Sequence, residues 1–322
     1  AALHLSLIAS GVNKNSEVIA PSLSFVAQLN VIKNLGAKAI LIDCKSFNDW
    51  NMNNEVIKKK ITSKTKAIII LHYAGYPNLI DKELLCICKR KNIKIIEDVA
   101  HAPGASINNK FCGTFGDFGC FSFFSNKNIS AGEGGLVVTK KRTDYNKVKL
   151  LRSHGMNKVS LDKIKGRAAT YDVSEFGLNY RIDEIRASLA IQQLKKLKKA
   201  NRLRKNNVLR YIKYLKNTKY DIPFQELEVN IKAAYHIFVL LVPKSLSRDG
   251  LIKFLKNHGV QSSIHYPKFW GFKAYEKEFS KKHYPVCNEI CDRAVTLPLY
   301  PDMLECDVKF VCTLLKEYLN GK

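Results

Sequence analysis

Two short apolar runs, each ending in chemically reactive side chains, most constrain how this chain can fold. Residues 94–96 form the first run, which ends in the acidic residues Glu97 and Asp98. Residues 120–124 form the second run, and a polar loop that carries Lys127 follows it. Ligands of a doubly wound α/β sheet bind at the carboxyl ends of its strands. We therefore expect the carboxylate and the amine to meet at one site.

The pair Asp98 and Lys127 suits the chemistry of pyridoxal phosphate. A lysine that attacks a carbonyl group needs a lowered pKa. Enzymes that use this cofactor also place a carboxylate beside the nitrogen of its pyridine ring. An acidic residue after a strand is commonly a helix cap or part of a salt bridge, so Asp98 gains this meaning only together with Lys127.

Strands and helices alternate along the first half of the sequence, which favours a parallel sheet covered by helices. The run at residues 67–73 is almost uninterrupted in its apolar character, as expected of a parallel strand that is buried on both faces. The predicted strands are residues 17–21, 37–43, 67–73, 94–96, 118–124 and 136–139. The predicted helices are residues 1–10, a helix that begins near residue 27, and residues 54–61 and 81–91.

The second half predicts a connector and a smaller domain. Residues 183–198 form a strongly amphipathic pattern, and residues 195–216 are expected to be a long basic helix that joins two domains. A strand, a helix and a second strand are then predicted at residues 234–242, 247–258 and 260–265. The prediction is a large domain over residues 1–205 and a small α+β domain over residues 206–322.

Three blocks in this order resemble the DegT/DnrJ/EryC1/StrS family, the pyridoxal-phosphate aminotransferases of nucleotide sugars. The blocks read EDVAHAPGA, GTFGDFGCFSFFSNKNISAGEGG and GLNYRIDEIRASLAIQQL. The likeness extends from Ala1 to about Met303 and is much more specific than one motif would be. It implies an α/β fold of the aspartate-aminotransferase type (type I), with a large, mixed, mainly parallel sheet and a smaller C-terminal α+β domain.

The resemblance also implies roles for individual residues. Lys127 would bind the cofactor covalently, and Asp98 would keep its ring nitrogen protonated. Ser122 and Asn179 would contact the cofactor phosphate, Asn179 from the neighbouring subunit, which implies a homodimer with shared active sites. Three further residues are expected at the cofactor: Phe25 stacked on the ring, His101 near the ring and its phenolic oxygen, and Ala1 at a backbone position that contacts the phosphate. Ordinary packing of Phe25 and a structural histidine at position 101 remain alternatives.

The start of the chain departs from the family pattern. Members of the family carry an N-terminal arm of several tens of residues before the helix that corresponds to residues 1–10. We therefore expect this sequence to be a fragment or an incompletely predicted reading frame. Residues 157–171 are rich in lysine and weakly patterned, and we expect them to form an ordered but adaptable loop on the substrate side.

The function that these features imply is amino transfer from glutamate to a keto group of a nucleotide-linked deoxysugar, for surface polysaccharide or glycoconjugate biosynthesis. A dehydratase branch of the family has histidine in place of the lysine, so Lys127 argues against that activity. Other pyridoxal-phosphate lyases and desulfurases lack the second and third blocks together. A degenerate relative without catalysis stays an alternative because the N-terminal arm is absent.

The chain is strongly basic, with 53 lysine and arginine residues against 28 acidic residues and a net charge of +25. Such a charge can indicate a nucleic-acid partner. The lysines, however, lie mostly on predicted helix faces and in linkers, without a compact motif of basic and aromatic residues. We expect no nucleic-acid partner, although a positive field would favour a substrate that carries a diphosphate.

Hydropathy and cysteine content predict a soluble protein of the cytoplasm. No apolar run approaches the roughly 20 residues that span a bilayer, and the first residues lack the basic lead of a signal peptide. The nine cysteines are odd in number and scattered. They show no convincing zinc-binding spacing, so we expect reduced, mostly buried thiols and no metal site.

Overall fold

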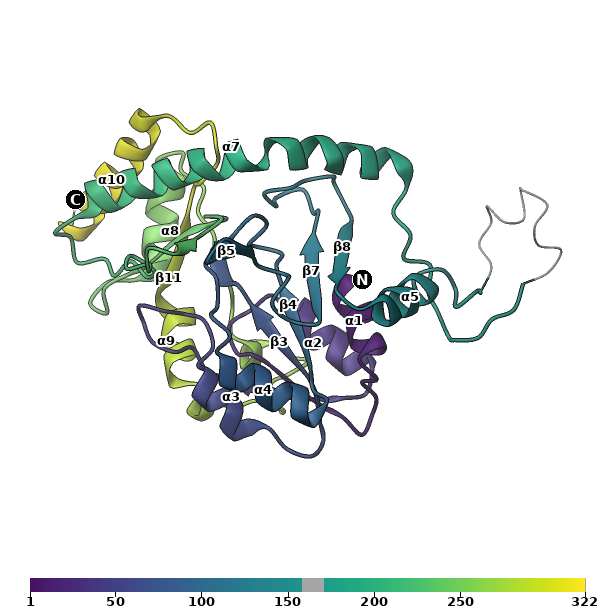
Figure 1. Ribbon diagram of the computed structural model, residues 1–322. Helices are drawn as coiled ribbons and strands as arrows, with labels where there is room; N and C mark the ends of the chain where they lie inside the picture. Colours follow the sequence, from purple (N-terminus) through teal and green to yellow (C-terminus); the bar gives the residue numbers. More distant parts are fainter. Residues whose placement is uncertain (158–170, 322) are drawn as a thin grey trace.

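A six-stranded sheet forms the centre of the molecule, in the strand order β2-β1-β3-β4-β7-β8 (Figure 1). The computed structural model describes residues 1–157 and 171–321. The first five strands are parallel, and β8 runs antiparallel to β7. The predicted mixed, mainly parallel sheet is therefore confirmed. Its strands are β1 (Glu17–Pro21), β2 (Lys38–Ile42), β3 (Thr65–Leu71), β4 (Lys94–Asp98), β7 (Phe118–Ser122) and β8 (Gly135–Thr139).

Helices cover both faces of this sheet because neighbouring strand residues point to opposite sides. Val18 packs with one set of helices, and Ile19 packs with the other. The first set is α1 (Ala2–Ala9), α2 (Ala27–Asn34) and α5 (Arg142–Leu151). The second set is α3 (Asn54–Lys60) and α4 (Lys82–Lys91). The alternation of strand and helix in the sequence thus yields two apolar layers around one sheet.

A second apolar core lies in the C-terminal part, where β10 and β11 pair antiparallel. The C-terminal half of a long helix, α7, and two further helices enclose this core. The elements after residue 183 are α7 (Glu184–Leu215), β9 (Ile231–Lys232), β10 (Phe238–Leu241), α8 (Arg248–Asn257), α9 (Pro285–Arg293), β11 (Ala294–Leu297) and α10 (Glu305–Leu319). Shorter elements are η1 (Tyr73–Gly75), β5 (Ser106–Ile107), β6 (Lys110–Phe111), η2 (Phe269–Gly271) and η3 (Lys281–His283).

Two expectations for this half need correction. The predicted helices at residues 183–198 and 195–216 are one continuous helix of 32 residues, α7, which lies along one edge of the molecule (Figure 1). Because α7 runs through residue 205, the division of the chain at that point stays a prediction. The strand expected at residues 260–265 is wrong, since only Ser263 pairs there, in a single bridge to Thr296. The apolar strand β11 occupies the place beside β10 instead.

Other expectations concern loops, thiols and membranes. Of the loop predicted at residues 157–171, residues 158–170 lie outside the described part of the chain. Among the described helices, none is both long enough and apolar enough to span a bilayer. All nine cysteines are free thiols, and those at positions 44, 88, 112, 120, 287, 291 and 312 are buried, as predicted.

The buried carboxylate of Glu97 fixes the loop that leads from β6 to β7. It accepts hydrogen bonds from the backbone N–H groups of Gly113, Phe115 and Gly116, each 2.7 Å long. His72 contacts the same carboxylate through Nε2 at 3.0 Å. The two neighbouring acidic residues therefore have different roles. Glu97 holds this loop, while Asp98 points in another direction.

The close approach of this loop to β7 generates a stability prediction. A Cβ added at Gly119 would lie 2.3 Å from the carbonyl oxygen of Gly113 and 2.6 Å from its Cα. We expect Gly119→Ala to lower the free energy of unfolding by about 1–3 kcal/mol, because backbone atoms must move apart. Urea denaturation measures the change. Gly271→Ala is the matched control, since its nearest neighbour is Lys268 Cγ at an ordinary 3.5 Å. Equal stability of the two variants would contradict the prediction.

Candidate active site

A cavity of about 930 Å³ opens where β4 and β7 end and α1 begins. Six of the seven residues that the sequence assigned to a site line this one cavity: Ala1, Phe25, Asp98, His101, Ser122 and Lys127. The seventh, Asn179, is exposed and does not belong to the lining in the described part of the chain. The parallel strand ends therefore bring together residues that are about 100 positions apart.

The carboxylate of Asp98 is fixed in orientation at the end of β4. Gln28 Nε2 donates to its Oδ2 atom at 2.6 Å, and the Ala100 N–H group donates to its Oδ1 atom at 3.0 Å. The side chain is buried, with 7% of the residue exposed. Two donors on a buried carboxylate stabilise its negative charge. Each oxygen keeps a further lone pair for a donor in the cavity.

Lys127 follows β7 in a tight turn, in which its N–H group donates to the carbonyl oxygen of Phe124 at 2.9 Å. Burial lowers the pKa of the Lys127 amine to about 8, and the negative charge of Asp98 partly opposes this shift. An amine with that pKa is partly unprotonated near neutral pH, unlike an ordinary lysine. Lys127 can therefore act as a nucleophile toward an aldehyde.

His101 and Tyr266 form a second polar pair at the cavity. The Ala74 N–H group donates to His101 Nδ1 at 3.3 Å, and His101 Nε2 lies 2.7 Å from the Tyr266 hydroxyl. Burial and the charge of Lys127 hold the pKa of His101 well below its usual range, so the ring is neutral. Its proton then sits on Nε2 and is donated to Tyr266. The Tyr266 hydroxyl keeps its own proton free to donate into the cavity.

Behind this pair, a buried amide network links the cavity to α7. The rings of His101 and His236 are 4.4 Å apart, and His236 Nδ1 lies 2.9 Å from Asn128 Oδ1. Asn128 Nδ2 donates in turn to Asn201 Oδ1 on α7 at 2.9 Å. These paired side chains form a buried polar network against which the His101 ring packs.

Other residues of the lining can receive an aromatic ring and an anion. Phe25 is 58% exposed in the cavity, with its ring centroid 5.7 Å from that of Tyr266. The hydroxyl of Ser122 accepts only a long hydrogen bond of 3.3 Å from the Phe124 N–H group. The first turn of α1 also reaches the cavity and contains no acidic residue. The N–H groups of a helix N-terminus bind anions such as phosphate.

Positive charge dominates the remaining lining. Besides Lys127, the basic side chains of Lys149, Arg152, Arg181 and Arg186 line the cavity. The acidic residues of its lining are Asp98 and Glu133. A cavity of this charge attracts an anionic ligand. Part of the net charge of +25 is therefore located at this cavity, which the composition alone could not show.

Sequence reasoning missed several of these residues. Gln28 lies on the buried side of α2 and has no motif of its own, so nothing in the sequence shows that it reaches Asp98. Tyr266 stands between His265 and Pro267, and nothing in this short segment shows that its hydroxyl reaches His101. Asn128 follows Lys127 directly, and its link to α7 depends on tertiary structure. The basic positions were visible in the sequence, but their common direction was not.

Comparisons with known proteins agree on one family. The sequence profile described as the DegT/DnrJ/EryC1/StrS aminotransferase family matches residues 1–316. The uncharacterized protein MJ1066 of Methanocaldococcus jannaschii is 34% identical over 326 residues, which cover 99% of this chain and 84% of that protein. The solved structure of the putative sugar aminotransferase Spr1654 from Streptococcus pneumoniae, in its PMP form, superimposes with a TM-score of 0.89 at 26% identity, over 99% of this chain and 86% of that one.

A third relative has a named pathway. PseC of Helicobacter pylori, an aminotransferase involved in the biosynthesis of pseudoaminic acid, superimposes with a TM-score of 0.87 at 25% identity. The match covers 100% of this chain and 85% of PseC. These similarities confirm the aspartate-aminotransferase-like fold that the sequence predicted.

The electrostatics of Lys127 give a prediction for the protein without cofactor. We expect the rate at which acetic anhydride modifies Lys127 to reach half its maximum at a pH of about 8, because burial lowers the pKa of the amine. Asp98→Asn should shift this midpoint to lower pH, since the carboxylate raises the pKa of Lys127. Mass spectrometry of the modified peptide measures both values. A midpoint near the ordinary value of about 10.4, or no shift in the variant, would contradict the prediction.

Proposed function

Because this chain belongs to the DegT/DnrJ/EryC1/StrS aminotransferase family, we propose that it transfers an amino group from glutamate to a keto group of a nucleotide-linked deoxysugar. The family is described as aminotransferases, and its solved relative Spr1654 is a putative sugar aminotransferase in its PMP form. The donor, the nucleotide and a role in surface polysaccharide or glycoconjugate biosynthesis are the proposed parts. The central observation is a half-buried amine of lowered pKa, Lys127, in one cavity with the fixed carboxylate of Asp98.

The residues present fit this cofactor. Pyridoxal phosphate, when bound, supplies an aldehyde and an electron-accepting ring. Lys127 would bond to the aldehyde, and Asp98 would hold the proton of the ring nitrogen. Phe25 would pack against the ring, while Ser122 and the first turn of α1 would donate to the phosphate. The free lone pairs of Asp98 and the absence of acidic side chains in the first turn of α1 support this orientation.

Lys127 would also move the proton during transfer. Whenever its Nζ atom is not bonded to the cofactor, Lys127 would be a free amine inside the site. A base with a pKa of about 8 can accept a proton from the substrate carbon and return it at neutral pH. Tyr266, which accepts from the neutral ring of His101, would position its own hydroxyl proton toward the bound groups.

The charge of the cavity supports a nucleotide-linked substrate. Four basic side chains lie beyond Lys127 in a volume of about 930 Å³. A diphosphate bridge carries the negative charge that these side chains would neutralise. The family and the sugar aminotransferase Spr1654 account for the sugar part of the proposal. The nine free thiols suit the reducing cytoplasm, where we place the enzyme.

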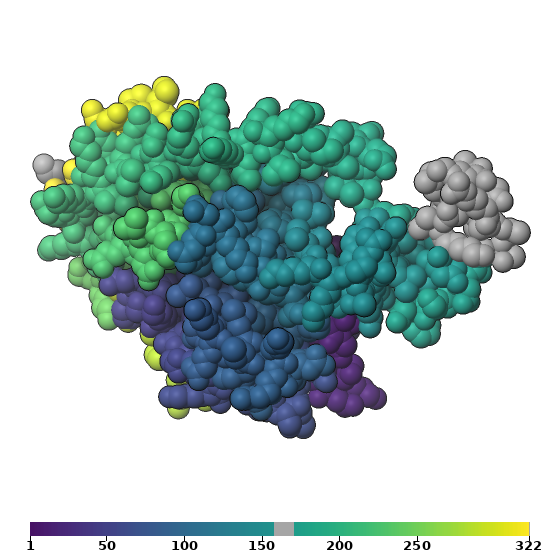
Figure 2. Space-filling view, viewed as in Figure 1, coloured from purple at the N-terminus to yellow at the C-terminus, as the bar shows by residue number. Residues whose placement is uncertain are grey.

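Exposed apolar side chains support a homodimer. The N-terminal half of α7 and the segment before it expose a set of large apolar residues that a second subunit would cover. Figure 2 shows the teal segment that precedes α7 at the edge of the molecule. The exposed residues are Phe176, Ile185, Leu189, Ile191 and Leu194. Asn179 lies close to them in the sequence and would reach the cofactor phosphate of the partner.

The alternatives receive less support. A dehydratase of the same family would have histidine at position 127, and this chain has lysine. A degenerate relative would have no need for a lysine of lowered pKa in the same cavity as a buried carboxylate, since removing either charge from water is costly. The observed pair therefore favours an active transaminase.

Direct assay tests the proposed function. Protein loaded with pyridoxal phosphate should convert glutamate and a nucleotide-linked keto-deoxysugar into equal amounts of 2-oxoglutarate and nucleotide-linked amino sugar. Mass spectrometry of the products measures both. The free keto sugar is the matched control and should react much more slowly, because it has no diphosphate for the basic side chains to bind. Failure to aminate any member of a panel of nucleotide keto-sugars would refute the proposal.

The covalent role of Lys127 gives a second test. Borohydride should fix pyridoxal phosphate irreversibly to the wild-type chain, and the added mass should map to the peptide that carries Lys127. Lys127→Ala should lose this mass and at least about 10³-fold in amino transfer, because the nucleophile and the proton carrier are gone. Lys149→Ala is the control for borohydride fixation, since Lys149 lines the same cavity but is not expected to bond to the cofactor. Fixation that persists in Lys127→Ala would refute the assignment.

The dimer proposal predicts an effect of charge on α7. We expect the double variant Ile185→Asp and Ile191→Asp to be a monomer in light scattering, because burying two carboxylates in an interface is costly. Leu209→Asp is the control. Leu209 is 51% exposed on the same helix but lies in its C-terminal half, away from the proposed interface. A wild-type chain that is itself monomeric would exclude the shared active site.

A further inference from the structure

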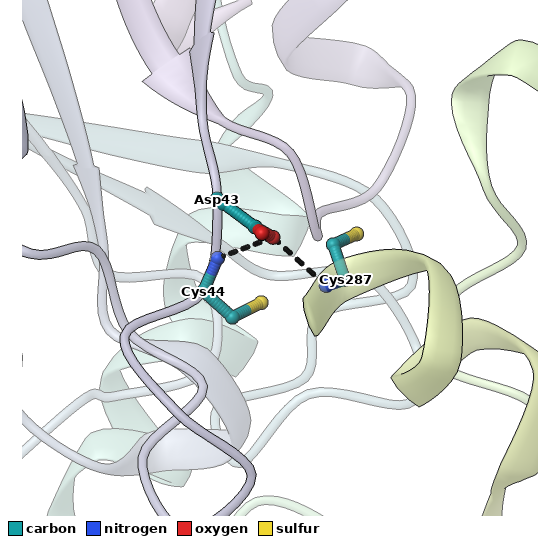
Figure 3. Close-up of side chains that lie close together, drawn as sticks. All are labelled: Asp43, Cys44 and Cys287. Carbon is teal, nitrogen blue, oxygen red and sulfur yellow. Dashed lines mark hydrogen bonds between the residues drawn. The ribbon is translucent and has the colours of Figure 1, made fainter. Parts of the chain in front are cut away.

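Away from the active-site cavity, three buried sulfur atoms and a carboxylate gather where β2 meets α9. Asp43 and Cys44 directly follow β2, and Cys287 lies in the first turn of α9. The ligand atoms of these three residues all lie within 4.8 Å of one another (Figure 3). Cys291, one turn further along α9, places its sulfur 3.8 Å from that of Cys287. Because positions 44 and 287 are far apart in the sequence, the cluster could not be predicted from residue spacing.

Capping of α9 explains only part of the cluster. The carboxylate of Asp43 accepts hydrogen bonds from the N–H groups of Cys44, Val286 and Cys287, at 2.8, 3.0 and 2.8 Å. It therefore caps α9 from a different element of the chain. A cap needs the carboxylate but gives no reason for three thiols around it. None of these thiols forms a disulfide.

A further polar group faces the same sulfur atoms. The hydroxyl of Ser22 interacts with the Cys287 thiol and has no further hydrogen-bond partner in the described part of the chain. Ser22 is only 2% exposed. The thiols therefore share their buried surroundings with a polar group.

We propose that Asp43, Cys44 and Cys287 bind a Zn²⁺ ion. Cys291 lies outside this group of three but next to Cys287, and its thiol would turn toward the ion to complete the site. Structural zinc sites are tetrahedral, with four protein ligands rich in thiolate and Zn–S distances of about 2.3 Å. That geometry separates two sulfur ligands by about 3.8 Å, which is the distance between the sulfurs of Cys287 and Cys291. The carboxylate supplies the fourth ligand. Its oxygens keep lone pairs for the ion beside the N–H groups that they accept from.

The site would be structural rather than catalytic. None of its four residues lines the cavity that holds Asp98 and Lys127. The ion would instead tie the end of β2 to the first turns of α9, which leads directly into β11 of the C-terminal core. Zinc binding would thus add to the stability of the contact between the central sheet and the C-terminal part. It would leave amino transfer unchanged.

Zinc content and affinity test the proposal on the whole protein. Chelator-treated wild-type protein should take up about one equivalent of Zn²⁺ per chain, measured by mass spectrometry of the metal, and its melting temperature should rise. Cys44→Ser and Cys287→Ser should bind zinc at least about tenfold more weakly. Cys86→Ser and Cys306→Ser are the matched controls, because both thiols are exposed and far from the cluster in the chain. Zinc binding that is equally strong in all four variants would overturn the site.

A second measurement needs no variant and so does not depend on how the variants fold. Co²⁺ added to the chelator-treated wild-type protein should give the intense visible absorption of tetrahedral cobalt and a thiolate-to-cobalt band in the near ultraviolet. Zn²⁺ should abolish both by displacement. Weak octahedral absorption without a thiolate band, or less than about a tenth of an equivalent of bound zinc, would show that the thiols are packed side chains only.

Discussion

The site depends on one electrostatic arrangement, a carboxylate held rigid at the end of β4 and an amine kept out of water in the turn after β7. Gln28 and the Ala100 N–H group fix Asp98, while burial lowers the pKa of Lys127 to about 8. Both groups are costly to bury. The cost is consistent with the proposed function, in which both groups act on one ligand of this cavity.

The rest of the structure keeps these two strand ends in register. Glu97, the neighbour of Asp98, uses its carboxylate to fix the loop before β7. Asn128, the neighbour of Lys127, ties its turn to Asn201 on α7. Asp98 is thus preceded, and Lys127 followed, by a residue that holds the local structure. Both of these neighbours belong to buried polar networks. Such networks hold a single conformation when all their members are paired.

The sequence predicted the parts of the fold that local pattern determines. The strands before residue 140 and the pair Asp98 and Lys127 followed from apolar runs and their polar ends. Partners that meet only in three dimensions could not be predicted, such as Gln28 with Asp98. The strand predicted at residues 260–265 is wrong for the same reason, because strand pairing depends on tertiary structure. β11 pairs with β10, and this segment forms only one bridge. The cluster of Asp43 with Cys287 likewise joins positions that no spacing rule connects.

A crystal structure of the protein with pyridoxal phosphate tests the central arrangement most directly. We expect continuous density between Lys127 Nζ and the cofactor, with an Asp98 oxygen at hydrogen-bond distance of about 2.7–2.9 Å from the ring nitrogen. The phosphate should then lie at the first turn of α1. A cofactor bound elsewhere, or one whose ring nitrogen points away from Asp98, would contradict the assignment of both residues.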